Sequence, residues 1–199
     1  MDRVNVYLDG EYGFSLAMGV AASLKRGDIL SEEEIRELQS RDAVQKAYDR
    51  ALDYLAYRPR SSAELRRYLR KKQVSTEVGE AVLERLSAAG LLDDGAFARY
   101  WVENRETFKP RGRRALRHEL RQKGIDDELI AEVLSEIDEE ESAYRAAVSQ
   151  AQRYDHLDDR VFRQKMYGFL RRRGFGYEVV RETVSRLLQQ SAEEGGEDS

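Results

Sequence analysis

Residues 116–137 read LRHELRQKGIDDELIAEVLSEI, and their apolar pattern occurs twice more, 51 residues earlier in residues 65–86 and 50 residues later in residues 166–187. Within each copy, apolar side chains recur every three or four positions, which is the spacing of an amphipathic helix. Self-similarity at a fixed period indicates an array of supersecondary units that bury their apolar faces against one another. The corresponding positions are Leu65, Leu69, Val74, Val78, Val82, Leu83 and Leu86; Leu116, Leu120, Ile125, Leu129, Val133, Leu134 and Ile137; and Met166, Leu170, Phe175, Val179, Thr183, Val184 and Leu187.

Each copy supplies the second and third helices of a three-helix unit, and a further helix precedes it. The turn between the second and third helices carries Gly124 and Gly174, and glycine suits the left-handed residue that ends many helices. Gln73 stands at this place in the first unit, so we expect a different turn or a different C-cap there. The expected first helices cover 42–57, 94–108 and 139–154, the second 61–72, 111–123 and 158–173, and the third 75–89, 126–137 and 176–190.

The fold class that this pattern predicts is mainly α, with three tandem three-helix repeats forming an elongated, curved body. The repeats are expected at 42–92, 93–138 and 139–190. Only two prolines interrupt a chain rich in alanine, leucine, glutamate and arginine, which are all good helix formers. We expect an N-terminal extension at 1–41 and a disordered acidic tail at 191–199, because the tail has too little apolar surface to bury.

The N-terminal extension is predicted to begin with a short β-hairpin. Alternating residues Val4–Leu8 and Glu11–Leu16 flank Asp9-Gly10, and Asp-Gly is the strongest short hairpin signal. A lone hairpin is marginal in water, so it should pack on a helix, which we expect from Leu16 to Lys25. Ser31, followed by three glutamates, has the form of a capping box, and a helix should run from there, with a break near Ser40, to about residue 57.

Composition narrows the cellular context and the chemistry. The chain has no cysteine, which excludes disulfides and cysteine-ligated zinc and suits a reducing cytoplasm. Its first residues lack a basic segment followed by an apolar one, and no window approaches the roughly 18 apolar residues of a membrane span. We therefore expect a soluble, cytoplasmic protein without a membrane-bound role.

The net charge of −4 is unevenly distributed along the chain. Residues 57–123 hold 17 Lys and Arg against 9 Asp and Glu, and residues 143–188 hold 10 against 5. Residues 126–142 carry 9 acids and no base. Local charge therefore says more about partners than the sum does.

The poor inventory of reactive groups argues against catalysis. The two histidines, His118 and His156, lie in different repeats without a metal-ligand spacing around them. Acidic pairs at 93–94 and 126–127 stand just before predicted helices, where carboxylates cap backbone N–H groups more often than they bind Mg²⁺. Most tyrosines, Tyr177 among them, have helical spacing and apolar neighbours, so we expect them to pack in the core or between units rather than stack on bases. We predict no enzyme activity, no cofactor and no metal.

The second helices carry the candidate binding residues. Arg113, Arg117 and Arg121 recur every fourth residue, and such like-charged pairs each disfavour a helix by about 0.2–0.5 kcal/mol. The excess recurs in all three units, which favours a basic surface for phosphates or an acidic protein over a solvated face neutralised by neighbouring acids. The candidates are Arg66, Arg67, Arg70 and Lys71; Arg111, Arg113, Arg114, Arg117, Arg121 and Lys123; and Arg171, Arg172 and Arg173.

A combination of short motifs between about residues 43 and 188 resembles the RecX family, which regulates the RecA recombinase. The segment Val6–Glu11 also resembles the N-terminal extension of some members. The combination is more specific than any single motif, and Gln73 is the one departure from it. The motifs are Arg60-Ser61-Ser62-Ala63-Glu64-Leu65; Leu91-Leu92-Asp93-Asp94 with Phe97-Ala98 and Arg105; Gly112, Leu116, Glu119-Leu120 and Lys123-Gly124-Ile125; and Arg173-Gly174-Phe175.

The resemblance implies a regulator that lodges in the groove of a RecA filament on DNA, and a monomer is the default expectation for its oligomeric state. There it would limit filament growth, strand exchange, ATP hydrolysis and co-protease activity, and so regulate recombinational repair and the SOS response. It brings no catalytic residues, and contact with single- or double-stranded DNA is expected.

Two other functions stay open at this stage. A three-helix unit is also the size of a helix-turn-helix module, so the chain could bind duplex DNA without a recombinase. It could also be a structural adaptor that holds an acidic peptide between its units.

Overall fold

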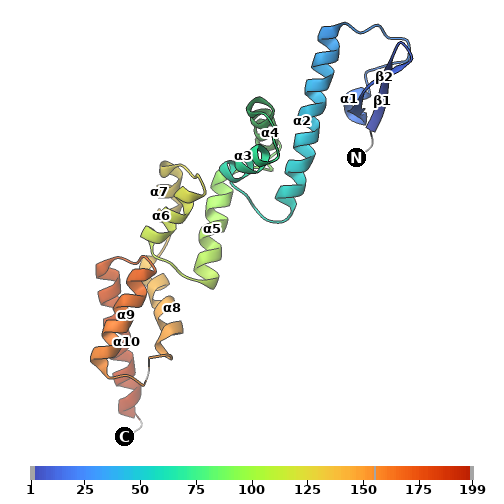
Figure 1. The fold of residues 1–199 in the computed structure, drawn as a ribbon. Helices are drawn as coiled ribbons and strands as arrows, with labels where there is room; N and C mark the ends of the chain where they lie inside the picture. Colours follow the sequence, from blue (N-terminus) through green and yellow to red (C-terminus); the bar gives the residue numbers. More distant parts are fainter. Residues whose placement is uncertain (1–2, 155, 198–199) are drawn as a thin grey trace. The chain divides into compact units, whose positions relative to one another are not determined.

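A computed structural model describes residues 3–154 and 156–197 of the chain. The chain folds into two compact units, Met1–Asp93 and Asp94–Ser199. In Figure 1 the first unit runs from blue to green and the second from light green to red. The described residues are mostly helical, with one short two-stranded sheet, which confirms the predicted fold class. The predicted curvature and the repeat boundaries stay predictions.

The first unit contains the hairpin and the first repeat. Strands β1 (Arg3–Leu8) and β2 (Glu11–Ala17) pair antiparallel, with an irregularity in register between Val6 and Tyr7. Asp9 and Gly10 form the turn with positive φ angles of 50° and 90°, as an Asp-Gly hairpin turn requires. The unit continues with helices α1 (Met18–Ala21), α2 (Glu32–Ala56), α3 (Ser62–Lys71) and α4 (Thr76–Ala88).

Two expectations for the N-terminal extension were wrong. Leu16 and Ala17 lie in β2, so α1 is a single turn and not the helix predicted from Leu16 to Lys25. Helix α2 runs without the expected break near Ser40, because its interior contains neither proline nor glycine. The capping box at Ser31 is present, with the Ser31 hydroxyl accepting from the Glu34 N–H and the Glu34 carboxylate accepting from the Ser31 N–H.

Asp42 of α2 anchors the hairpin. Its side chain is buried, and it accepts hydrogen bonds from the Arg3 guanidinium at 3.1–3.2 Å and from the Ala17 N–H at 2.6 Å. Lys46 adds an ion pair at 2.8 Å. A separate apolar cluster of Leu16, Ala17, Val20 and Leu38 lies beneath the hairpin. The extension is therefore attached to α2 by a small core and one multiply bonded carboxylate.

The first repeat packs around its own core, which includes Leu65, Leu69, Val82 and Leu86. The predicted difference in its turn is absent. Gln73 adopts a positive φ of 60°, and its N–H bonds to the Arg70 carbonyl at 2.9 Å. Gly124 and Gly174 make the same bond to the carbonyl three residues earlier, at 2.9 and 3.0 Å. The tertiary packing thus holds Gln73 in a conformation that glycine adopts without cost.

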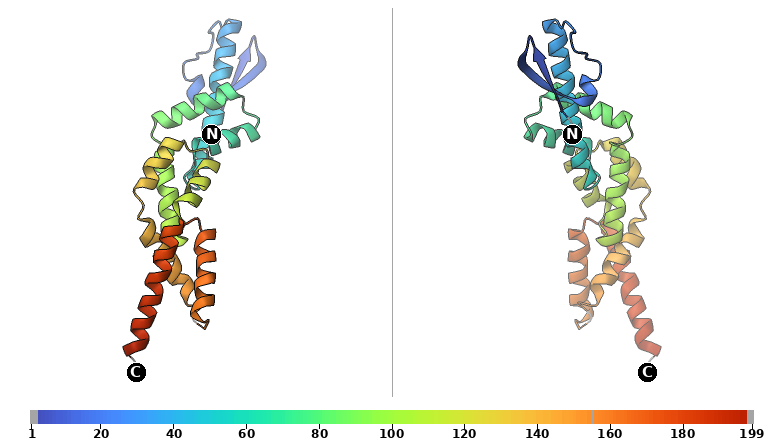
Figure 2. Two further views of the ribbon diagram at one scale, coloured as in Figure 1. Left: turned by 90° about the vertical axis from the view of Figure 1, so that its left-hand side faces the viewer. Right: turned by 90° about the vertical axis from the view of Figure 1, so that its right-hand side faces the viewer.

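The second unit contains the second and third three-helix repeats, each with its own core. Helices α5 (Asp94–Phe108), α6 (Arg113–Gln122) and α7 (Asp127–Ser135) surround a cluster that includes Phe97, Leu116 and Leu120. Helices α8 (Glu139–Ala151), α9 (Asp159–Arg172) and α10 (Tyr177–Glu197) surround one that includes Met166 and Leu170 (Figures 1 and 2). Separate cores agree with a repeat array.

Some helix ends differ from the sequence prediction. Helix α10 continues to Glu197, so the helix runs into the segment 191–199 that was expected to be disordered, whose last two residues lie outside the described ones. Helix α8 ends at Ala151, near the expected 154. Asp126 and Asp138 cap α7 and α8 by accepting N–H bonds from Glu128 and Glu141. The Asp126 cap bears out the capping interpretation of the acidic pair at 126–127.

We predict that acid releases the hairpin from α2. Burial by itself raises the pKa of Asp42, but the hydrogen bonds from Arg3, Lys46 and Ala17 together outweigh it and lower that pKa below its ordinary value. The anchor is therefore fully present above the unfolded-state pKa of about 3.9 and is lost as the pH falls through the lower folded-state pKa. NMR signals of the β1 amides should shift in that window. In Asp42→Asn they should be shifted already at neutral pH, with the docked state weakened by about 1–3 kcal/mol. A hairpin that stays docked in this variant would contradict the assignment.

We also predict that Gln73→Gly stabilises the first repeat. A non-glycine residue in the left-handed region strains the folded state by roughly 1–2 kcal/mol, and glycine removes this strain. Glycine also makes the unfolded chain more flexible, which offsets roughly 0.4–1 kcal/mol of that gain. Hydrogen exchange of the α3 and α4 amides should slow, corresponding to about 0.5–1 kcal/mol of extra opening free energy. Gln73→Ala keeps the strain and should bring no gain. Faster exchange in the glycine variant would refute this account.

Candidate functional site

A backbone contact between two glycines brings the second and third repeats together within the second unit. Gly112, at the start of α6, packs directly on the Gly174 peptide in the turn between α9 and α10, so a Cβ atom at Gly112 would collide with the Gly174 carbonyl group. The φ of −68° and ψ of 157° at Gly112 are open to any residue, so this position needs glycine for space. Gly174 requires glycine for two reasons: its φ is +89°, and a Cβ atom there would lie 2.5 Å from the Cβ of Ala115.

Polar bonds surround this glycine contact. The Gly112 N–H donates to the Arg173 carbonyl at 3.0 Å, and the Arg173 guanidinium donates to the Pro110 carbonyl at 3.1 Å. Burial, and secondarily the nearby Arg111 charge, lowers the pKa of Arg173. The Arg113 N–H donates to Glu139 of α8 at 2.9 Å. The second and third repeats are therefore joined by main-chain and charged bonds as well as by close packing.

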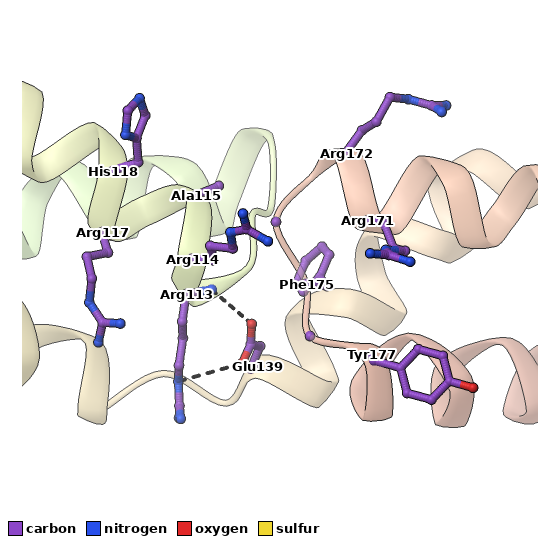
Figure 3. Close-up of a pocket in the computed structure, with 12 residues that line it drawn as sticks. Arg113, Arg114, Ala115, Arg117, His118, Glu139, Arg171, Arg172, Phe175 and Tyr177 are labelled. Carbon is purple, nitrogen blue, oxygen red and sulfur yellow. Dashed lines mark hydrogen bonds and ion pairs between the residues drawn. The ribbon is translucent and has the colours of Figure 1, made fainter.

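The joint opens into a basic groove between α6, the end of α9 and the start of α10 (Figure 3). Its volume is about 840 Å³. Figure 3 shows Arg114 of α6 and Arg171 of α9 extending into the space on either side of Phe175. The lining residues are Arg113, Arg114, Ala115, Arg117, His118, Glu139, Arg171, Arg172, Gly174, Phe175, Gly176 and Tyr177.

The arginines of this basic groove are poorly neutralised. Within residues 3–154 and 156–190, no carboxylate forms an ion pair or hydrogen bond with Arg114, Arg117, Arg171 or Arg172, and the charge of Arg117 is felt at longer range by Asp127, whose pKa it helps to lower. Glu139 is the single acid in the lining, and its oxygens are already engaged by Arg113. Like charges gathered without counter-ions raise the local positive potential, which attracts anions.

Other predicted binding residues of the second unit have structural roles. Arg111 pairs with Glu119 at 2.9 Å, and Lys123 lies 4.5 Å above the ring of Trp101. Arg121 makes a bidentate pair with Asp127 at 2.6 and 3.0 Å, and this bond lowers the pKa of Asp127. The predicted stripe of Arg113, Arg117 and Arg121 therefore does not act as one surface, because its last member is neutralised by α7.

The candidates of the first unit lie on α3. Arg66 makes a bidentate pair with Glu80 of α4 at 2.7 and 3.0 Å, and this bond lowers the pKa of Glu80. Arg67, Arg70 and Lys71 are exposed to solvent. The basic surface of α3 belongs to the first unit, and none of its side chains lines the basic groove.

Three groove residues with polar side chains were not selected as binding residues from the sequence. Tyr177 was assigned to packing, yet its side chain is 60% exposed. His118 was set aside as a metal or catalytic residue; its side chain is exposed and lines the basic groove beside the arginines. Glu139 is the first residue of α8, and its carboxylate accepts a hydrogen bond from the Arg113 N–H. The one feature of the sequence that could have indicated Tyr177 as a groove residue is the Gly174-Phe175-Gly176 turn directly before it.

The described residues contain no group of three His, Asp or Glu side chains arranged for a metal ion. Among the same residues, no helix has the length and apolar character to cross a membrane.

Comparison with known sequences assigns the chain to a protein family. Family models match each repeat: the first three-helix domain of RecX matches residues 47–86, the second 93–134 and the third 138–184. The chain belongs to the RecX family. It is similar to the protein named regulatory protein RecX of Bacillus licheniformis, with 36% identity over 90% of this chain and 70% of that protein. The corresponding values for the RecX of Bacillus subtilis strain 168 are 34%, 97% and 75%.

Solved structures of RecX proteins have the same fold. A crystal structure of regulatory protein RecX matches with a TM-score of 0.76 and 32% identity, covering 90% of this chain and 91% of the other. The RecX of Lactobacillus salivarius matches with a TM-score of 0.66 and 26% identity, over 73% of this chain and 97% of that one. The two Bacillus proteins and the first of these structures carry the name regulatory protein RecX, in agreement with the regulatory role that the motifs implied.

We predict that Gly112→Ala disrupts the joint of this RecX-family chain. The new methyl group meets backbone atoms that cannot rotate away, and such overpacking costs about 1–3 kcal/mol. The amide of Gly112, now bonded to Arg173, should exchange faster in the variant. Gly176→Ala is the matched control, since a Cβ there meets nothing within 4 Å. Equal effects of the two substitutions would show that the joint does not depend on the glycine contact.

Proposed function

We propose that this RecX-family chain inhibits RecA by binding in the groove of the RecA–DNA filament, where it limits filament growth, strand exchange and ATP hydrolysis. It would thereby regulate recombinational DNA repair in the cytoplasm, as a monomer and without catalysis of its own. The observation that carries the proposal is the basic groove, in which Arg114, Arg117, Arg171 and Arg172 have no carboxylate partner among the described residues. Membership of a family of regulatory proteins supplies the target.

The basic groove suits a filament because a filament presents rows of phosphates and acidic protein surface. Guanidinium groups bind phosphate and carboxylate bidentately, and their exchange for condensed counter-ions makes the binding strongly dependent on salt. A protein seated in this way occupies space that an incoming subunit or a second DNA strand requires. Inhibition then follows from occupancy, without any chemical step.

Charge disfavours the alternative of a stand-alone helix-turn-helix protein. In such a module the last helix enters the major groove with its N-terminal residues against the bases. Asp126 caps α7 and Glu128 lies in its first turn, and α4 carries Glu77 in its first turn. Acidic residues at these places would repel DNA phosphates, so insertion of α4 or α7 is unfavourable.

The test is to add the purified chain to RecA filaments on single-stranded DNA and to follow ATP hydrolysis and filament length. We predict that Arg114→Ala/Arg117→Ala raises the concentration needed for half-inhibition about tenfold and lowers the salt slope by about 2, because two phosphate contacts are lost.

The matched control is Arg160→Ala/Arg163→Ala on α9, which removes the same charge from exposed positions outside the basic groove. It should inhibit like the parent chain. Equal loss in both double variants would reduce the effect to net charge and exclude the basic groove as the contact. A parent chain that leaves ATP hydrolysis and filament length unchanged would overturn the proposed function.

A further inference from the structure

The hairpin of the first unit has an open edge. Within the described residues its sheet has two strands, so β1 pairs on one side only. The main-chain groups of residues 4–8 bond across the hairpin to β2, and no other described group bonds to them. A β-strand points successive N–H and C=O groups to its two sides in turn, so β1 presents a row of donors and acceptors on its outer side.

The features that usually protect an edge strand are present on β2 and missing from β1. In β2, Gly13 is an extra residue, because Phe14 and Tyr12 lie opposite consecutive residues of β1. The end of β2 is also bonded to Asp42 of α2. Residues 4–8 read VNVYL, without a proline or a charge. Bulges, prolines and charged side chains keep exposed edges from pairing, so β1 is the strand that can accept a partner.

A cleft, the edge cleft, runs along this side of β1. Its other wall is the loop at residues 22–31 between α1 and α2, which passes beside the hairpin (Figure 1). Its volume of about 640 Å³ falls in the range of roughly 300–1,000 Å³ that proteins use for ligands. Val6, Leu24 and Leu30 pack on the small core beneath the hairpin and give the edge cleft an apolar lining.

The charge of the edge cleft lies on the loop wall and is mainly positive. Lys25 and Arg26 are exposed, and no carboxylate of the described residues forms an ion pair with either. Asp28 is the one acid in the lining, and it accepts a hydrogen bond from the Lys25 N–H at 2.8 Å. This bond ties the Asp28 carboxylate to the loop backbone. The wall therefore attracts an anionic segment and repels a cationic one.

We propose that the edge cleft binds an extended acidic segment of a partner protein. The segment adds a third strand to the hairpin. Its main chain pairs with β1, its apolar side chains rest on the apolar lining, and its carboxylates face Lys25 and Arg26. Strand addition of this kind takes its affinity from main-chain bonds and its specificity from alternate side chains. The edge cleft belongs to the first unit, so its use is independent of the basic groove and of the proposed function.

A second copy of the chain fits the edge cleft less well than a single segment does. The hairpin is a ribbon of two strands, and neighbouring strands lie about 4.7–4.9 Å apart. If the hairpin of another copy paired with β1, its second strand would have to lie where the loop wall stands. A single extended segment needs no such space. Tyr7 and Ile29 are 61% and 96% exposed on the two walls and offer it further apolar area.

The experiment measures binding of the full chain to a fluorescein-labelled peptide by fluorescence anisotropy at neutral pH. The probe alternates valine and glutamate over about eight residues, enough to span β1, and places the two residue types on opposite faces of the extended peptide. The parent chain should bind it about tenfold more tightly than a valine–lysine peptide of equal length, because the latter brings like charges to the loop wall. Hydrogen exchange of the outward-pointing β1 amides should slow on binding.

Charge reversal on the loop wall tests the selectivity. Lys25→Glu/Arg26→Glu changes two exposed side chains and should invert the preference, so that the valine–lysine peptide binds more tightly. Arg41→Glu/Arg50→Glu on α2 is the matched control, because it makes the same change of charge in the same unit at exposed positions outside the edge cleft. It should bind both peptides like the parent chain. Equal effects of the two double variants would reduce the selectivity to net charge and overturn the inference.

Two methylated probes test strand addition itself. Methylation of every valine nitrogen removes the N–H donors along one edge of the peptide, and methylation of every glutamate nitrogen removes those along the other. Only one edge of the peptide faces β1, so one of these probes should lose binding and the other should keep it. Loss in both or in neither, or unchanged exchange of the β1 amides, would overturn the inference. So would a chain that dimerises through β1 in sedimentation and leaves the peptide unbound.

Discussion

The contact between Gly112 and Gly174 is the constraint on which the candidate site depends. Two backbones meet where neither residue has a side chain, so the start of α6 and the end of α9 come closer than any other pair of residue types would allow. The N–H of Gly112 then reaches the Arg173 carbonyl, and both repeats lie against one joint. Without this approach, Arg114 and Arg171 would belong to separate surfaces and would not face the same space.

Gathering four unpaired arginines in one groove has an energetic cost. Elsewhere the chain neutralises its basic helices, as in the bidentate pairs of Arg66 with Glu80 and Arg121 with Asp127. Exposed pairs of this kind contribute little to stability because solvent screens them, so their main effect is on where positive charge remains. In the second unit of this structure, positive charge that no carboxylate neutralises remains in the basic groove. An anionic partner gains most there, because no internal carboxylate has to be displaced from those four side chains.

Much of the fold could be predicted from the sequence, because it depends on periodic burial. Leu65, Leu116 and Met166 stand at one position of the repeat, and all three side chains are fully buried. The Asp-Gly hairpin and the Ser31 capping box also follow local rules and are present. The errors fall where tertiary packing overrides a local preference. Gln73 takes the left-handed turn of a glycine, and Leu16 and Ala17 join a strand that Asp42 holds through the Ala17 N–H.

The sequence alone determined the helical repeat, the family resemblance and the excess of arginine on the second helices, because these are properties of spacing and composition. It could not separate arginines that bind from arginines that support the structure. Arg113, Arg117 and Arg121 have identical spacing, yet only the tertiary structure brings Asp127 to Arg121. It also decided that Arg114, Arg171 and Tyr177 share one groove. The reason is physical: charge pairing and exposure depend on distances between residues far apart in the chain, and the glycine contact that fixes those distances leaves no periodic signal.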